Sequence, residues 1–223
     1  FDQGLALVKE FTKGEKCQGL CLGISRQVRP GAPLKSELGK IFGGRVYLEN
    51  DAALAGLGEA HRGAGRGHRI IVYVTVSTGV GGVKIEDGRI DENALGFEPG
   101  QQIIVADGQR QTLEDLVSGG SVERRFKQLP YKITDEKIWQ ELSRYLAIGL
   151  ANSLLHWSPD CLILGGSMFK TPGFRVETIE RLLGEYLTNF PKLPVVRPAA
   201  LGEIGGLYGA LVYLNQQRAA VSS

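Results

Sequence analysis

The sequence predicts an α/β protein, and three observations support that prediction. Short apolar runs rich in β-branched residues alternate with segments of helical periodicity, which is the element order of α/β folds. Two of these runs lead directly into glycine-rich turns. The composition, with 43% hydrophobic and 22% charged residues, is that of an average globular protein and excludes disordered, fibrous and membrane classes.

Length and charge narrow the class of protein further. The 223 residues suffice for one large domain or two small ones at about 150 residues per domain. Its 26 basic and 24 acidic residues leave a net charge of +2, too small a surplus to indicate a nucleic-acid binder. No apolar run reaches the ~20 residues of a membrane span, and residues 1–16 contain no apolar signal core. We therefore expect a cytoplasmic protein that binds neither nucleic acid nor a membrane.

Cysteine usage argues against a disulfide framework. Cys17, Cys21 and Cys161 are odd in number and form no Cys-x-x-Cys pair, so cysteine alone builds neither disulfide pairs nor a zinc site. Small buried thiols in a reducing compartment are expected instead. Glycine, with 31 residues, is about twice as frequent as usual, which indicates tight bends or a backbone that approaches a ligand.

The first fifty residues predict two helices and two strands. Helical spacing extends over 1–13, an apolar strand over 17–25, a short helix over 34–42 and a second strand over 45–48. A helix therefore precedes each of the two strands.

Three polar residues, Glu49, Asn50 and Asp51, directly follow the second strand. The alanine-rich segment 52–60 predicts a helix, so Asn50 or Asp51 is expected to cap it. A carboxylate at this place can also accept the proton of a substrate hydroxyl during phosphoryl transfer. The residues alone leave both roles open.

The rest of the chain predicts a hairpin followed by alternating helices and strands. A strand over 69–77 leads into the turn 78–82, and a strand over 83–86 ends at the turn of Asp87 and Gly88. Further elements are expected as a helix over 138–157, a buried strand over 159–164, and helices over 174–189 and 202–217.

The two glycine turns are candidate ligand sites. The segment Thr75–Gly82 offers hydroxyls and uncrowded N–H groups after an apolar strand, which are the components of a phosphate-binding nest. It is not a Walker A loop, because no Lys-Ser or Lys-Thr follows it. The turn Gly165-Gly166-Ser167 stands at another strand end, where ligands of α/β sheets gather. An ordinary hairpin corner would give the first pattern equally well.

Two glutamates are candidates for binding the hydroxyls of a polyol. Glu98 lies in a glycine-flanked loop, and Glu114 begins a predicted helix. Either could equally be a surface charge or a favourable charge at a helix N-terminus. The three histidines show neither His-x-His nor His-x-x-x-His spacing, and none is assigned to chemistry.

Six motifs in order resemble one family. The chain contains ENDAALAGLGEA, VYVTVSTGVGG, GFEPGQ, TLEDLVSG, SPDCLILGGSM and ALGEIGGLYGA. Together they resemble the bacterial repressors, open reading frames and sugar kinases called ROK, over about residues 17–217. Their ordered occurrence is far more specific than any one of them.

The resemblance implies the actin-like, ribonuclease-H-like ATPase fold of two-domain sugar kinases. It implies a partial small α/β domain over 1–49, with the N-terminal domain incomplete, and a large domain with the sugar and nucleotide sites over 50–201. Residues 202–223 would form a C-terminal helix that packs back on the small domain. A homodimer is also implied.

The resemblance also assigns roles to residues. Asp51 matches the catalytic base and Asn50 a residue that holds the sugar. Thr78 and Gly79 match the second phosphate loop, and Gly165 and Gly166 the adenosine turn. The positions matching the sugar-binding residues are Glu98, Gln101 and Glu114.

Three departures from the family pattern stand out. The opening strand pair with its Asp-x-Gly-Gly-Thr phosphate loop, whose Asp helps to hold Mg²⁺ and ATP, is absent from this sequence. The family commonly has His, a sugar and zinc ligand, where this chain has Gln101, and Gln is a poor zinc ligand. The cysteine-rich zinc loop is replaced by 106–112, so no structural zinc is expected. The segment between Ser25 and Leu34 is also shorter than in the family, so stretches of a longer parent are expected to be missing.

The leading functional hypothesis is ATP-dependent phosphorylation of a sugar hydroxyl, as in glucokinase or another hexose or N-acetylhexosamine kinase, with ATP and Mg²⁺ as cofactors. A catalytically inactive protein that binds a sugar or metabolite is the alternative, favoured by the missing loop and Gln101. A transcription regulator would need a DNA-binding helix pair, for which residues 1–16 are too short.

Overall fold

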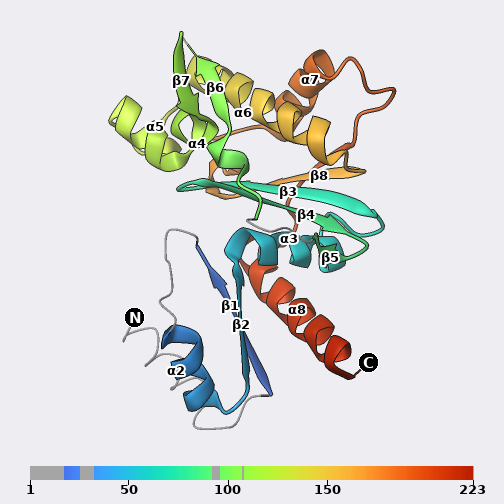
Figure 1. The fold of residues 1–223 in the computed structure, drawn as a ribbon. Coiled ribbons are helices and arrows are strands. Elements are labelled where there is room, and N and C mark those ends of the chain that lie inside the picture. Colours follow the sequence, from blue (N-terminus) through green and yellow to red (C-terminus); the bar gives the residue numbers. More distant parts are fainter. Residues whose placement is uncertain (1–17, 26–32, 92–95, 107, 223) are drawn as a thin grey trace.

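The computed structural model describes residues 18–25, 33–91, 96–106 and 108–222. A small and a large sheet organise it (Figure 1). The helix expected over 1–13 and Cys17 lie outside the described residues.

The small sheet pairs two parallel strands. β1 (Gly19–Ile24) and β2 (Arg45–Asn50) run in register from Gly19 opposite Arg45 to Ile24 opposite Asn50. Helix α2 (Pro33–Phe42) connects them and buries Leu38 and Phe42 against Val46. Both strands and the helix were predicted, and β2 extends two residues beyond its predicted end.

The large sheet has five strands in the order β5-β4-β3-β8-β9. β3 (Ile70–Val76), β8 (Cys161–Gly165) and β9 (Val195–Pro198) are parallel, whereas β4 (Val80–Glu86) and β5 (Arg89–Ile90) complete it antiparallel. β4 begins three residues before its predicted start, inside the glycine-rich turn, because its glycines pair with β3. β9 was not predicted.

Helices cover both faces of the large sheet (Figure 1). One face carries α4 (Leu113–Val117), α5 (Gly119–Phe126), α6 (Glu136–Trp157) and α7 (Val176–Tyr186). The other face carries α3 (Asp51–Arg62), and α8 (Gly205–Ser222) packs mainly against α3 and β1. Alternate strand residues point to opposite faces. Val72 and Val74 therefore join the core beneath α6, whereas Ile71 and Tyr73 join the core beneath α3.

Several short elements connect these layers. β6 (Ile103–Ala106) and β7 (Gln109–Thr112) form a hairpin. This hairpin overlaps the segment 106–112, which stands where the family has its cysteine-rich loop. The single-turn helices are η1 (Pro99–Gln101), η2 (Pro130–Lys132), η3 (Ser167–Phe169) and η4 (Gly202–Ile204). Among the described helices, none is both long and apolar enough to cross a membrane.

The two cysteines of the described part are ordinary packing residues. Cys21 is half-buried in β1, and Cys161 is fully buried in β8. Burial raises the pKa of each thiol to about 11. Both remain protonated at neutral pH and are poor nucleophiles.

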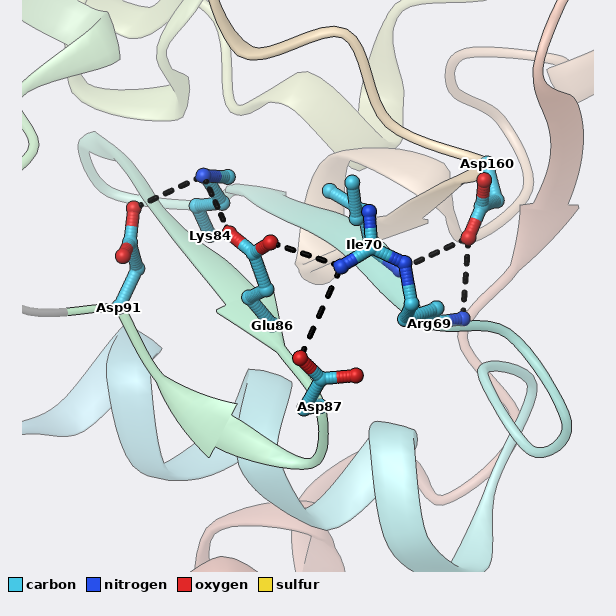
Figure 2. Close-up of polar contacts among 7 residues, drawn as sticks. All are labelled: Arg69, Ile70, Lys84, Glu86, Asp87, Asp91 and Asp160. Atoms are coloured by element: carbon cyan, nitrogen blue, oxygen red, sulfur yellow. Dashed lines mark hydrogen bonds and ion pairs between the residues drawn. The ribbon is translucent and has the colours of Figure 1, made fainter.

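A charged network holds the amino-terminal end of β3 (Figure 2). Arg69 and Lys84 both bond to Glu86 at 2.9 Å, and Lys84 also reaches Asp91 at 3.0 Å. Hydrogen bonds from Lys84 and Arg69 hold the pKa of Glu86 below its usual value. The contribution of these pairs is therefore present at neutral pH and is lost as the pH falls through that lowered pKa.

Asp160 joins this end of β3 to the strand beside it. Its Oδ2 accepts the backbone N–H of Arg69 at 3.0 Å and that of Ile70 at 2.8 Å (Figure 2). Asp160→Ala is expected to lower the free energy of unfolding by about 1–2 kcal/mol, measured by chemical denaturation, because both bonds lose their acceptor. Asp160→Asn, which keeps an acceptor oxygen, should lose less than half of that. Equal losses in the two variants would contradict this role.

Candidate functional site

The first residues of β4 are the place where the candidate site elements meet. Ala52 of α3 lies against Gly81, and Gly100 of η1 lies against Val80. Glu114 of α4 bonds to Val80. The segments carrying Asp51, Glu98, Gln101 and Glu114, which are far apart in the sequence, therefore all reach one end of a single strand.

Asn50, not Asp51, caps helix α3. The Oδ1 of Asn50 accepts the N–H of Ala53 at 3.0 Å, which leaves its amide nitrogen as a donor. Asp51 is the first residue of the helix and is exposed; its Oδ1 accepts the adjacent N–H of Ala52 at 2.8 Å. Of the two roles left open for the pair, the structure gives the cap to Asn50, so Asp51 is not needed for it. A carboxylate at this position is also favoured by the helix dipole.

Glu98 and Gln101 lie at the two ends of η1. Glu98 precedes the helix and is half-buried, whereas Gln101 ends it and is exposed. The neighbouring Gln102 fixes this segment, because its side-chain amide donates to Pro99 O at 2.8 Å and to Ser153 Oγ of α6 at 3.1 Å. Helix α6 therefore holds the loop that carries both candidate sugar ligands.

Glu114 reaches from the first turn of α4 to the turn between β3 and β4. Its Oε2 accepts the N–H of Val80 at 2.8 Å. The same oxygen lies 2.6 Å from the place where a side chain on Gly79 would put its Cβ, so only glycine leaves it this space. A candidate sugar ligand therefore contacts the candidate phosphate turn, which the linear sequence did not indicate.

The turn of Ser77, Thr78 and Gly79 offers unused backbone donors. Ser77 N donates to Gly79 O at 2.8 Å and closes the turn. Within the described residues, the N–H groups of Thr78 and Gly79 have no hydrogen-bond acceptor. Two adjacent N–H groups without protein partners are suited to an anion such as a phosphate.

A cavity of about 300 Å³ opens beside this turn. It lies at the carboxyl ends of β3 and β8, the edge of α/β sheets where ligands gather. The lining combines hydroxyl groups, glycine backbone, a lysine and an aromatic ring. Its residues are Ser77, Thr78, Gly119, Gly120, Glu123, Pro130, Tyr131, Ser167, Met168, Lys170 and Pro172.

The predicted glycines of the second turn lie next to this lining. Gly166 has a φ of 100°, and a Cβ on it would stand 2.2 Å from Val76 O. Gly165 packs in the same way against the ring of Tyr73. These two glycines bring the end of β8 close to β3 and so place Ser167 and Met168 at the cavity.

Sequence reasoning missed several residues of the cavity. Tyr131 is 62% exposed at its edge, and Glu123 and Lys170 also line it. They come from α5, η2 and the segment after η3, and only the fold brings these together. Within the described part of the chain, the structure groups no three His, Cys, Asp or Glu side chains that could hold a metal ion.

Comparisons with known proteins agree on one family. The model of the ROK family matches residues 24–217. Similar curated proteins include a fructokinase of Lactococcus lactis subsp. cremoris, 30% identical over 161 residues, and a glucokinase of Thermotoga maritima, 39% identical over 108 residues. The matches cover 67% and 45% of this chain but only 54% and 34% of those relatives. The chain therefore spans about half, or less, of the length of these relatives.

Solved structures give the same result for the fold. The ROK hexokinase from Thermus thermophilus has a TM-score of 0.77 at 28% identity, covering 96% of this chain and 86% of its own. The inorganic polyphosphate/ATP-glucomannokinase from Arthrobacter sp. strain KM has a TM-score of 0.63 at 27% identity, covering 96% and 82%. A Streptomyces griseus glucokinase in complex with glucose and AMPPNP, at 23% identity and a TM-score of 0.71 over 94% and 85%, shares the fold.

Proposed function

This chain belongs to the ROK family and has its actin-like α/β fold, and from this premise we propose that the protein phosphorylates a sugar hydroxyl with ATP. The observation that carries the proposal is the meeting of two candidate subsites at the start of β4. Thr78 and Gly79 offer N–H groups that have no acceptor among the described residues on one side, and the elements of Asp51, Glu98 and Glu114 surround the same strand end on the other. The named activities of fructokinase and glucokinase relatives support the same class of reaction.

In the proposed reaction, Asp51 accepts the proton of the attacking sugar hydroxyl. Asn50 uses Oδ1 for the helix cap and keeps its amide N–H groups for a sugar oxygen. Glu98 and Glu114 accept hydrogen bonds from other sugar hydroxyls, and Gln101 can both donate and accept one. Correct placement of the hydroxyl and stabilisation of charge supply most of the catalysis in such transfers.

The phosphoryl donor is proposed to lie in the cavity beside the turn of Ser77 to Gly79. The N–H groups of Thr78 and Gly79 and the amine of Lys170 suit phosphate oxygens, and the exposed ring of Tyr131 suits a nucleobase. Mg²⁺, bound with ATP, would neutralise charge on the transferred phosphoryl group. We propose no zinc in the site, because Gln101 stands at the position of the family's histidine ligand.

A second candidate function is an inactive binder of a sugar or metabolite. Gln101 favours it, since the substitution of a family histidine changes the sugar subsite. Asp51 favours the kinase instead, because it is exposed and does not cap α3, so its carboxylate is available to accept a proton. The two functions differ in turnover and not in sugar binding.

The test is an assay of protein expressed from the complete gene, because the chain spans about half of the length of its relatives. With ATP and Mg²⁺, one hexose or N-acetylhexosamine of a panel is expected to raise ADP release at least tenfold and to yield a sugar phosphate detectable by mass spectrometry. Inorganic polyphosphate serves as an alternative donor. Sugar binding without phosphorylation would establish the inactive binder, and absence of both would reject the proposal.

A further inference from the structure

Three hydrogen bonds hold the turn from Ser77 to Val80 against the junction of α4 and α5. Gly119 N donates to Ser77 O at 2.7 Å, and Gly120 N donates to Thr78 O at 3.3 Å. The third bond, from Val80 N to Glu114 Oε2 at 2.8 Å, uses a side chain. The first two bonds survive any substitution that leaves the backbone in place, whereas the third depends on the identity of residue 114.

The two carboxylate oxygens of Glu114 differ in their hydrogen bonding. Oε2 is committed to Val80, while Oε1 accepts no hydrogen bond from the described residues. Glu114 is partly exposed, so Oε1 can accept a ligand hydroxyl while Oε2 remains on the turn. One side chain therefore contacts both candidate subsites.

We propose that Glu114 is a positioning residue for the phosphoryl donor. By holding Val80, it fixes the turn in the form in which the N–H groups of Thr78 and Gly79 bond to no acceptor in the part of the chain that the structure describes. These groups are then available to the donor phosphates before the sugar binds. The link to the donor rests on the proposed function, whereas the link between Glu114 and the turn does not.

The negative charge of Glu114 is expected to weaken binding of the donor, although its Oε2 stabilises the turn by accepting a hydrogen bond. A carboxylate close to bound phosphates repels them, because like charges raise each other's energy at short range. What the turn needs is the acceptor oxygen, which glutamine also supplies. Glu114→Gln and Glu114→Ala should consequently differ in their effect on the donor, although both remove the carboxylate from the sugar.

The main experiment measures binding of a non-hydrolysable ATP analogue with Mg²⁺ by calorimetry, without sugar. Glu114→Ala is expected to raise its dissociation constant about tenfold, the effect of losing one hydrogen bond to the Val80 N–H. Glu114→Gln should bind the analogue as tightly as the wild type, within about twofold, or more tightly. Equal weakening in both variants, or none in either, would overturn the positioning role.

Gly79→Ala tests the same contact without changing Glu114. Its Cβ would come 2.6 Å from Glu114 Oε2, so the flexible carboxylate must shift from its present place, where it bonds to Val80. The variant is expected to weaken analogue binding like Glu114→Ala. Analogue binding at wild-type strength in Gly79→Ala would contradict the proposal.

Hydrogen exchange of the Val80 amide in the ligand-free protein separates this inference from the proposed function. Exchange should rise at least tenfold in Glu114→Ala and Gly79→Ala, but not in Glu114→Gln or in the neighbouring control Asp115→Asn. Unchanged exchange in Glu114→Ala would refute the link between Glu114 and the turn. Faster exchange in a protein whose wild type binds no nucleotide would refute the donor role together with the proposed function, and would leave only the structural link.

Discussion

Replacement of Asp51 by Asn is expected to lower the turnover of the kinase about 10²-fold or more. Asn has nearly the same size as Asp and can still form hydrogen bonds with the sugar. It cannot accept the proton of the attacking hydroxyl, because an amide is not a base at neutral pH. The substitution also removes a negative charge from the first turn of α3, which costs about 1 kcal/mol of stability or less. The measurement is turnover at saturating ATP, together with the dissociation constant of the sugar, which should change little.

The matched control is Glu177→Gln in the first turn of α7. Glu177 is an exposed acidic residue in the first turn of another helix, so its neutralisation imposes a comparable loss of charge and helix stabilisation. Its turnover should stay within twofold of the wild type. If Asp51→Asn behaved like Glu177→Gln, Asp51 would have no part in proton transfer. Capping would not give Asp51 another role in that case, because Asn50 caps α3.

Most of the fold could be predicted from hydrophobic periodicity. The alternation of Ile71, Val72, Tyr73 and Val74 carries the signal of a strand with a core on each face, and the structure has both cores. The family and the actin-like fold are confirmed by the comparisons. The domain limits at residues 49 and 201 and the homodimer stay predictions.

The elements that sequence reasoning missed lack a local signal. β7, with the sequence QRQT, is polar and forms because it pairs with β6, while β9 is a four-residue strand whose pairing with β8 is set by the helix between them. The candidate site shows the same limit. Asn50 and Asp51 could be found from their place at a strand end, but the bond from Val80 to Glu114 joins residues 34 positions apart and follows only from the fold.

The crossing of α3 and α8 carries the second large expected effect. A Cβ on Gly209 would stand 1.7 Å from Leu54 O, and one on Gly58 would stand 2.1 Å from Gly205 O. The two helices therefore touch through their backbones, and no side-chain rotation can relieve a clash with a carbonyl oxygen. Gly209→Ala must push α8 away from α3 and is expected to lower the free energy of unfolding by about 3 kcal/mol or more.

Gly206→Ala on the same helix is the control for Gly209→Ala. A Cβ at position 206 would meet nothing within 4 Å, so the substitution adds no clash. Alanine is favoured over glycine inside a helix by up to about 1 kcal/mol, and the variant should be as stable as the wild type or more stable. Opposite signs for the two glycine replacements in chemical denaturation are therefore expected. Because α3 begins with Asp51, Gly209→Ala should also reduce turnover in whatever fraction remains folded, whereas Gly206→Ala should not. A small, equal change in both variants would mean that α8 does not lie directly on the backbone of α3.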